Sequence, residues 1–400
     1  MLSLFKYNIS KFNSFFIIQF LILFPLLLMP SFFSFVNENI FELIKIIEYC
    51  LFFLFVYINF DYNLLKKYLA VGLLIFLNII VTLFYQTNND FLNLIVRITP
   101  LLILFVSSSN FKIFNLKILK RIQLFNFFIL TLILIFGLYA ENLFPQIFSG
   151  NNDLYSSRNP YDLFKILGLD IDVLCQVSDN LHNSAYLVVL LFFSFVYQKR
   201  TLSYFALFVT FILVLLYQVR TVQVAFLLLV LFYLYFHINN QKIRTIFIFS
   251  FSISIVLMII YLYFNFDYNT INRFSSGRLF VWQERIDILY QRNFLEIMFG
   301  TGYSSDSFFT NQWIYKKEPS NSHNDFLTLI FNGGLVSLLL FLFILYQIVK
   351  EDIVFGLLIF ITSFLSNGFL FRPIHLIYLF FLWKFMCANY GYINLRKCLD

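Results

Sequence analysis

Long apolar stretches recur along the whole chain, and much shorter polar connections separate them. An α-helix needs about 20 apolar residues to cross the roughly 30 Å hydrocarbon core of a bilayer, and fewer where the bilayer thins. The predicted fold is therefore all-α and polytopic, with residues 1–400 forming one integral-membrane domain. We predict twelve membrane spans, at residues 15–36, 40–60, 68–85, 91–106, 123–140, 184–197, 201–217, 222–237, 245–264, 325–348, 353–371 and 374–391.

Composition indicates that the solvent of this chain is lipid rather than water. Hydrophobic residues make up 60% of the chain and charged residues 12%, and the mean hydropathy is +0.82. Soluble domains carry roughly 25% charged residues, so a water-soluble surface is excluded. The abundance of Phe and Tyr resembles the bias of an AT-rich gene, and we do not interpret it as a binding feature.

The net charge of +7 is explained by the orientation of the spans. If the N-terminus is cytoplasmic, most basic residues fall in inner connections, as the positive-inside rule demands. The short outer connections then hold only Arg220 and Arg372. We expect a bacterial inner-membrane protein with both termini in the cytoplasm, and we do not expect a nucleic acid partner.

Cysteine positions and sequence motifs predict neither a disulfide nor a bound cofactor. Cys50, Cys387 and Cys398 fall near cytoplasmic ends of spans, which leaves Cys175 alone on the outer side. No cysteine or histidine spacing is typical of a metal site, and we assign no metal. The chain has no P-loop and no glycine-rich dinucleotide turn, so we expect no cofactor.

Two outer connections, residues 141–183 and 265–322, are much longer than the others. Loops of this length usually carry function or lack structure. The second contains Leu279, Trp282 and Ile286 at helical spacing, which predicts a short amphipathic helix. That helix either lies on the outer leaflet or packs inside a small extracytoplasmic cap. We expect the functional chemistry to face the periplasm, at these segments.

The segment from Arg273 to Arg278 has the features of an anion-binding turn. A Ser-Ser-Gly turn lets backbone N–H groups converge, and the two flanking arginines supply forked donors that fit phosphate oxygens. A diphosphate is the natural ligand for such a turn. The alternative is that these arginines meet anionic lipid headgroups.

His323 stands where the polar segment 265–322 meets the tenth predicted span. An imidazole at this place can remove a proton from a sugar hydroxyl, because its pKa lies near working pH. A histidine at a helix start is also often only a cap or an interface residue. Asn324 is itself an ordinary helix-start residue.

Arg220 and Arg372 each lie in a very short outer connection between two spans. An arginine so near hydrocarbon is costly unless it is paired or faces a polar cavity, which makes both functional candidates. Snorkelling to lipid headgroups is the competing explanation. The same two explanations apply to Arg97 in the fourth span.

These motifs and their order resemble the O-antigen polymerase and ligase superfamily of integral-membrane enzymes. The predicted twelve spans, with the largest outer loop before the tenth, agree with that resemblance along the whole chain. Arg220-Thr221 resembles the family's arginine at the outer end of a mid-chain span. Three further motifs follow in the family's order: Ser-Gly-Arg278-x3-Trp282, Phe299-Gly-Thr-Gly302-Tyr303 and His323-Asn-Asp-Phe-Leu327 ending in Gly334.

The resemblance implies a membrane-embedded glycosyltransferase fold, similar to the GT-C type, with short helices in its extracytoplasmic loop. It implies a glycan donor linked to undecaprenyl diphosphate, and no need for a metal. By matching position, Arg220 and Arg278 would hold the undecaprenyl diphosphate and His323 would act on the acceptor hydroxyl. The substrate-binding residues that we expect in addition are Arg273, Arg372 and Asn324.

The function that we expect is polymerisation of O-antigen, or related surface polysaccharide, on the outer face of the inner membrane. A polysaccharide chain-length regulator is a candidate partner, beside the lipid-linked oligosaccharide and the bilayer. The nearest alternative is the ligase that transfers finished glycan to lipid A-core. A flippase of lipid-linked oligosaccharide is an alternative from another class, but short outer loops and repeated halves would be expected of it, and this chain shows neither.

Overall fold

The structure is a computed structural model, and it divides the chain into two compact units that we describe separately. Unit 1 comprises residues 1–65, 102–230 and 374–400, and unit 2 comprises residues 66–101 and 231–373. The residues that the structure describes are 13, 19, 38–85, 94–106, 121, 124–125, 127–132, 181–193, 195–196, 201–217, 219–238, 240–265, 268, 277–303, 305–308, 310–312, 317–319, 322–366 and 368–396.

Helices occupy most of the positions at which spans are predicted, whereas most of the first span and much of the fifth lie outside the described residues. A helix satisfies its own backbone N–H and C=O groups, which is why apolar segments adopt it in lipid. The helices concerned are α3 (Glu38–Ile58), α5 (Leu69–Tyr85), α10 (Leu181–Phe193), α11 (Thr201–Tyr217), α12 (Arg220–His237), α13 (Gln241–Asn265), α17 (Asp325–Glu351), α18 (Ile353–Leu365) and α19 (Pro373–Arg396).

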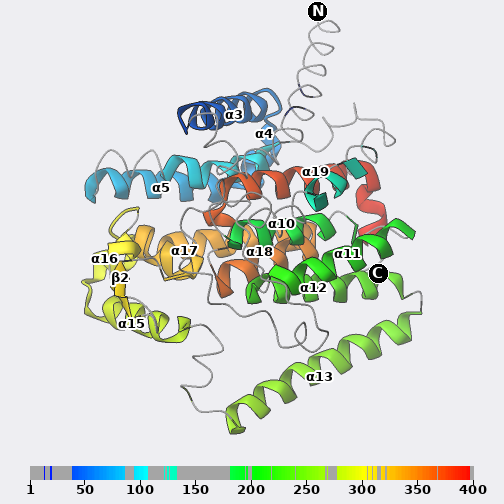
Figure 1. Cartoon of the computed structure of the whole chain (residues 1–400). Helices are drawn as coiled ribbons and strands as arrows, with labels where there is room; N and C mark the ends of the chain where they lie inside the picture. The colour runs from blue at the N-terminus through cyan, green and yellow to red at the C-terminus, as the bar shows by residue number, and fades with distance from the viewer. Residues whose placement is uncertain are drawn as a thin grey trace, which may run out of the picture. The chain divides into compact units, whose positions relative to one another are not determined.

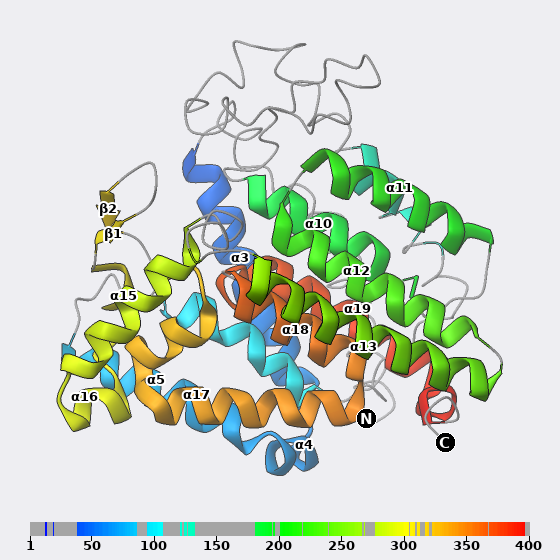
Figure 2. The same cartoon turned by 90° about the horizontal axis from the view of Figure 1, so that it is seen from below.

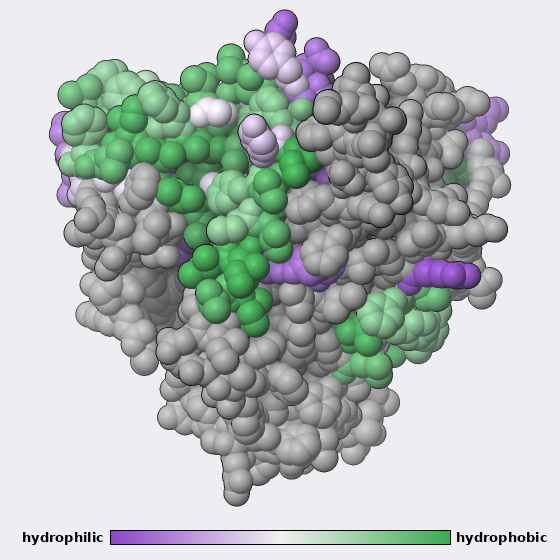
Figure 3. All heavy atoms as spheres, turned by 90° about the horizontal axis from the view of Figure 1, so that it is seen from above, coloured by the Kyte–Doolittle hydropathy of each residue, from purple (hydrophilic) through white to green (hydrophobic). Residues whose placement is uncertain are grey.

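Two of the described helices, α12 and α17, are long and apolar enough to cross a membrane. Shorter apolar helices include α5, α18 and the stretch Leu94–Phe105. Helices α3 and α5 each present hydrophobic side chains outward (Figure 3), and on α5 the exposed set includes Leu73, Phe76 and Leu83. These helices agree with a membrane protein, and the number of twelve spans remains a prediction.

Aromatic side chains form much of the core of unit 1. Helices α10 and α11 pack against each other, and Phe192 of α10 lies 5.5 Å from Phe226 of α12, ring centre to ring centre (Figure 2). Phe55 of α3 meets Phe381 of α19 at 5.3 Å. Ring pairs at these separations and tilts are favourable contacts in a core.

Helix α17 is the centre of unit 2. It packs against α5, α18 and the short helix α16 (Phe294–Phe299), as Figures 1 and 2 show. The amide of Asn78 on α5 donates to the Ser337 hydroxyl on α17 at 3.0 Å, and both side chains are buried. At the far end of α17, Lys67 and Tyr68 both bind the carboxylate of Glu351. Polar contacts therefore hold α5, and the two residues that directly precede it, against α17 at two levels.

A kink interrupts α17 at Gly333 and Gly334, whose backbone angles are not helical. Directly before the kink, the carbonyls of Phe331 and Asn332 accept hydrogen bonds from the segment after α16. Thr301 N–H donates to Phe331 O and Gly302 N–H to Asn332 O, both at 2.9 Å. The Gly-Thr-Gly segment and the Gly-Gly pair, separate in the sequence, thus bind each other.

The second long outer segment contains the short helices that were predicted, together with a small hairpin. The helices are α15 (Arg278–Gln291), α16 and the 3-10 helix η4 (Ser305–Phe308). Strands β1 (Thr310–Gln312) and β2 (Lys317–Pro319) pair antiparallel, which departs from the all-α prediction. Each strand has only three residues and none of them is strongly apolar, so the alternating pattern that predicts a strand from sequence is absent.

Helix α15 buries a different face from the one that its apolar pattern predicts. Val281 and Arg285 are fully buried, whereas Ile286 of the predicted apolar stripe is 42% exposed. Trp282 contacts Phe364 of α18, with 5.9 Å between ring centres. These contacts favour the alternative in which α15 packs inside a cap.

Candidate functional site

The site is built around the entrance to α17. Asn324 is the N-cap of this helix, and its side-chain oxygen accepts hydrogen bonds from the N–H groups of Phe326 at 2.9 Å and Leu327 at 3.1 Å. Its amide nitrogen donates to Phe364 O at 2.9 Å. The cap therefore holds the start of α17 against the end of α18. His323 precedes it immediately.

The backbone of His323 is left-handed, with φ 51°, and it is the only residue other than glycine with a positive φ in the described part of the chain. Few residue types tolerate this conformation, although histidine is enriched there together with Asn and Asp. Such strain persists only where the surroundings over-determine it, and it clusters at functional sites.

Arg278 lies at the first residue of α15 and reaches the end of α18. Gly277, the N-cap, has φ 81°, a conformation that glycine supplies without steric cost. From this turn the Arg278 side chain donates from Nη1 to Leu365 O at 2.6 Å. A guanidinium has five N–H donors, so one bond to a carbonyl does not by itself exclude phosphate binding.

Arg372 is the C-cap of the 3-10 helix η5 (Phe369–Phe371), between α18 and α19. It is only 9% exposed, and its Nη1 donates to Gly368 O at 3.0 Å. The N–H of Gly368 in turn donates to the buried carboxyl group of Asp325, at 3.0 and 3.1 Å to its two oxygens. The loop after α18 is thereby fastened to the first residue of α17.

His323, Arg278 and Arg372 form a single electrostatic cluster within unit 2. Burial lowers the pKa of the His323 imidazole to about 3, and the positive charges of Arg278 and Arg372 contribute to the same shift. The imidazole is therefore neutral at working pH, but its pKa lies well below the expected value near working pH, so its lone pair is only weakly basic while the two arginine charges face it. Three residues that were predicted from separate motifs are thus brought together.

This arrangement provides two kinds of chemistry at one place. Two guanidinium groups can stabilise negative charge on a leaving oxygen in surroundings where water is scarce. A neutral imidazole can take a proton from a hydroxyl group within hydrogen-bond reach. An anion bound between the arginines would offset their charges and make the imidazole a stronger base.

The remaining predicted site residues are placed differently. Arg220 is the exposed first residue of α12 and belongs to unit 1, so a role beside the cluster stays a prediction. Arg273 lies outside the described residues. Both the oxygen and the nitrogen of the Asn324 side-chain amide are hydrogen-bonded to backbone groups. A contact between Asn324 and the substrate stays a prediction.

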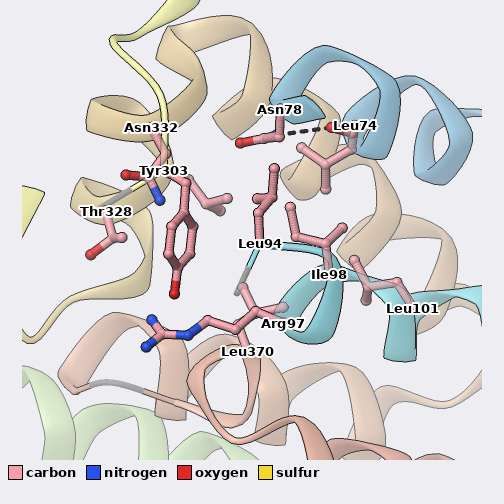
Figure 4. A pocket seen from close by; sticks show the side chains of 11 residues that line it. Leu74, Asn78, Leu94, Arg97, Ile98, Leu101, Tyr303, Thr328, Asn332 and Leu370 are labelled. Atoms are coloured by element: carbon pink, nitrogen blue, oxygen red, sulfur yellow. Dashed lines mark hydrogen bonds between the residues drawn. The ribbon is translucent and has the colours of Figure 1, made fainter. Parts of the chain in front are cut away.

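A mostly apolar pocket lies beside α17 (Figure 4). Arg97 and Tyr303 point into it from two different segments, and the Arg97 guanidinium carbon lies 5.2 Å from the centre of the Tyr303 ring. Thr328 and Asn332 of α17 and Leu370 of η5 are among the other residues that line it. Arg97 thus faces a pocket within unit 2, which disfavours the snorkelling explanation for this residue.

Arg285 and Asp306 are the residues near the site that sequence reasoning missed. Arg285 Nε lies 2.9 Å from Asp306 Oδ1, and both side chains are 1% exposed. Arg285 lies off the predicted apolar stripe of α15, and periodicity alone treats such a charged residue as a surface residue. A partner 21 residues away along the chain leaves no local signal.

The fold agrees with a helical membrane protein, and the cluster is a basic site at one end of a long apolar helix. Residues 205–342 match the family model described as O-antigen ligase. This match confirms the resemblance to the O-antigen polymerase and ligase superfamily, whose members are glycosyltransferase-like enzymes. A search of curated proteins and a search of solved structures each found no match.

The matched range contains three of the predicted catalytic residues, Arg220, Arg278 and His323. It ends before Arg372, which joins the cluster only through the tertiary structure. The match supports an O-antigen ligase-like or polymerase-like function in general, and it does not distinguish the two.

Proposed function

We propose that this protein polymerises O-antigen or a related surface polysaccharide on the periplasmic face of the inner membrane. The donor is a glycan linked to undecaprenyl diphosphate, and the acceptor is a hydroxyl group of another lipid-linked repeat unit. Both termini are cytoplasmic, and a chain-length regulator is a candidate partner.

The observation that carries this proposal is the cluster of His323, Arg278 and Arg372 at the entrance to α17. It joins a neutral base to two cations at the end of a long apolar helix. A diphosphate on a lipid anchor and a sugar hydroxyl would meet in such a place. The family match over residues 205–342 supports the same reaction class.

The proposed transfer breaks the bond between the anomeric carbon of the donor sugar and the diphosphate oxygen. The same carbon forms a new bond to the acceptor oxygen, and the acceptor proton passes to the His323 imidazole. Undecaprenyl diphosphate leaves with the bonding electron pair, and Arg278 and Arg220 stabilise its charge, with Arg273 and Arg372 as further contacts. The energy comes from the donor bond, and these side chains supply the charge stabilisation without a metal.

The second candidate is the ligase reaction, in which the acceptor is lipid A-core. The description of the matching family, O-antigen ligase, favours it. The donor, the leaving group and the proposed residue roles would be the same. Only the acceptor differs, and a cellular experiment can therefore separate the two.

The test is to delete the gene and to examine extracted lipopolysaccharide on a gel. Loss of a polymerase leaves one repeat unit on core, whereas loss of a ligase leaves none. If the lipopolysaccharide pattern of the deletion strain equals that of the parent strain, both candidates are wrong.

Complementation then tests His323 itself. We expect His323→Ala to reach the membrane and to fail in glycan chain extension because the base is lost, and we expect the same of His323→Asn, whose side chain tolerates the positive φ. His237→Ala is the matched control, since the ring of His237 binds Tyr233 O within its own helix, α12. A wild-type length distribution from the His323→Ala strain would remove His323 from the mechanism.

A further inference from the structure

The carboxylate of Asp306 lies at the centre of a buried hydrogen-bond network beside the cluster. Its Oδ1 accepts from Arg285 Nε at 2.9 Å. Its Oδ2 accepts from the backbone N–H of Ser322 and from the Thr328 hydroxyl, both at 2.7 Å. All four residues are at most 4% exposed. Asp306 thereby connects α15, η4 and both sides of the entrance to α17.

Ser322 is the residue before His323, and both its backbone N–H and its backbone C=O are hydrogen-bonded to side chains. Its N–H donates to Asp306, and its carbonyl accepts from Trp282 Nε1 at 3.0 Å. The two peptide planes on either side of Ser322 are therefore each fixed by one hydrogen bond, and the second of them leads into His323. This explains how the left-handed backbone of His323 is maintained.

The same network also fixes the helix that carries Arg278. Arg285 follows Arg278 by seven residues, close to two helical turns, so the two side chains leave α15 on nearly the same face. The bond between Arg285 and Asp306 therefore sets the rotation of α15 about its axis. Asp306 is thus tied both to the residue before His323 and to the helix that carries Arg278.

A buried ion pair is weak evidence for stability by itself. The free energy needed to remove two charges from water is often as large as the free energy gained from their attraction. A protein with apolar residues in place of such a pair can therefore be equally stable. One role that such pairs can serve is to select one arrangement of the elements around them. Here the arrangement selected is that of α15 against the entrance to α17.

We propose that Asp306, oriented by Arg285, is a positioning residue that holds His323 and Arg278 in their reactive arrangement. This inference rests on the proposed transferase function, because it assigns no contact with substrate to Asp306. It predicts that loss of the network slows the chemical step and leaves the affinity for substrate largely unchanged.

The main test compares Asp306→Asn with Asp287→Asn, using the full-length enzyme purified in detergent. An asparagine amide has one oxygen where the carboxylate has two, so Asp306→Asn cannot accept from both Arg285 Nε and the Ser322 N–H, and one of these two bonds is lost. Asp287 is an exposed carboxylate on the same helix as Arg285, α15, and gives the same chemical change away from the network. We expect kcat to fall about 10- to 100-fold for Asp306→Asn, with KM within about twofold, and neither constant to change for Asp287→Asn.

A second readout does not depend on enzymatic activity. Diethyl pyrocarbonate modifies neutral histidine, and mass spectrometry reports the rate at each position. We expect His323 to react several-fold faster in Asp306→Asn, because its backbone is released. His237, bound within its own helix, serves as the internal reference.

Two milder variants test the same network in case Asp306→Asn does not fold. Trp282→Phe removes the indole N–H that binds Ser322 and keeps an aromatic ring against Phe364. Thr328→Val removes the hydroxyl bond to Asp306 and keeps the side-chain shape. Both leave the ion pair intact. We expect each to lower kcat several-fold and to raise the reactivity of His323, while the loss of one buried hydrogen bond lowers the unfolding temperature by only a few degrees.

Two results would overturn the inference. In the first, folded Asp306→Asn keeps the wild-type kcat and the wild-type reactivity of His323. In the second, Asp306→Asn does not fold, and both milder variants keep the wild-type values, which would give the network a purely structural role. Full activity of His323→Ala would instead refute the proposed function, and the modification rates would still report whether Asp306 positions His323.

Discussion

His323 combines a left-handed backbone with an imidazole that burial and two arginines keep neutral. Its position at a loop-to-helix junction could be read from the sequence, and so could its candidacy as a base. The depressed pKa could not be, because Arg278 precedes it by 45 residues and Arg372 follows it by 49. The charge state of the base is thus a property of the cluster rather than of the motif.

The pKa shift predicts how stability depends on pH. The folded protein has a His323 pKa of about 3, below the ordinary value of about 6.5. Between these values the unfolded chain binds a proton that the folded protein does not, so stability falls as pH decreases from about 6.5 toward 3. This dependence should be smaller in His323→Asn, which does not titrate and tolerates a positive φ.

Unfolding temperatures of wild type and His323→Asn in detergent, at pH 7.5 and pH 4.5, measure this difference. Wild type should lose more stability than the variant on acidification. Equal losses would show that His323 is not held neutral by its surroundings.

Arg278 offers a second test at the level of one side chain. Arg278→Lys keeps the positive charge and loses the planar fork that can bind two phosphate oxygens at once. We expect turnover to fall about tenfold and glycan yield to drop in complemented cells. Arg244→Lys on α13 is the matched control, because the Arg244 side chain donates from Nε to Ile238 O, a carbonyl close to it in the sequence. Unchanged yield and chain length from Arg278→Lys would favour the lipid-headgroup explanation.

At the scale of elements, the kink of α17 connects two glycine motifs that the sequence shows only as separate segments. Gly334 has φ 70°, and a Cβ atom there would lie 2.1 Å from Met298 O. Gly300 has φ 75°, and its Cβ would lie 2.5 Å from the Asn332 carbonyl carbon. The lack of a side chain at Gly300 and Gly334 therefore allows α16 to pack closely against α17. This packing places the segment from Gly300 to Asp306 beside the site.

The kink gives a prediction about stability. Gly334→Ala should destabilise the protein by roughly 2–4 kcal/mol, from the strained φ and from overlap with α16. Gly72→Ala on α5 is the control, because a Cβ there meets nothing within 4 Å. The control should lose no stability and can gain up to about 1 kcal/mol. Thermal unfolding in one detergent compares both, and equal stability of the two variants would contradict the kink contact.

Helix α15 shows why an apolar stripe can mislead. Its position was predicted, since the spacing of Leu279, Trp282 and Ile286 is helical. Its buried face was predicted wrongly, because Arg285 is buried and Ile286 is exposed. A charged residue enters a core when a partner neutralises it, and here the partner is Asp306.

At the scale of the whole molecule, the distribution of charge predicts the orientation of the chain in the membrane. Positive charges indicate that the connection between α12 and α13 is cytoplasmic and that the segment after α13 is periplasmic. A fusion to alkaline phosphatase after Asn311 should therefore be active, and one after Asn240 inactive. β-Galactosidase fusions at the same two positions should show the opposite pattern, and the reverse of both results would invert the topology.

The sequence alone determined that the apolar segments form helices and that His323 and Arg278 are functional candidates. These conclusions depend on local features, since a helix satisfies its backbone within one segment and a motif lies within a few residues. Only the tertiary structure decided that Arg372 joins them, that the glycine motifs bind each other and that Arg285 is buried against Asp306. Each of these depends on a contact between distant segments, which no local pattern encodes.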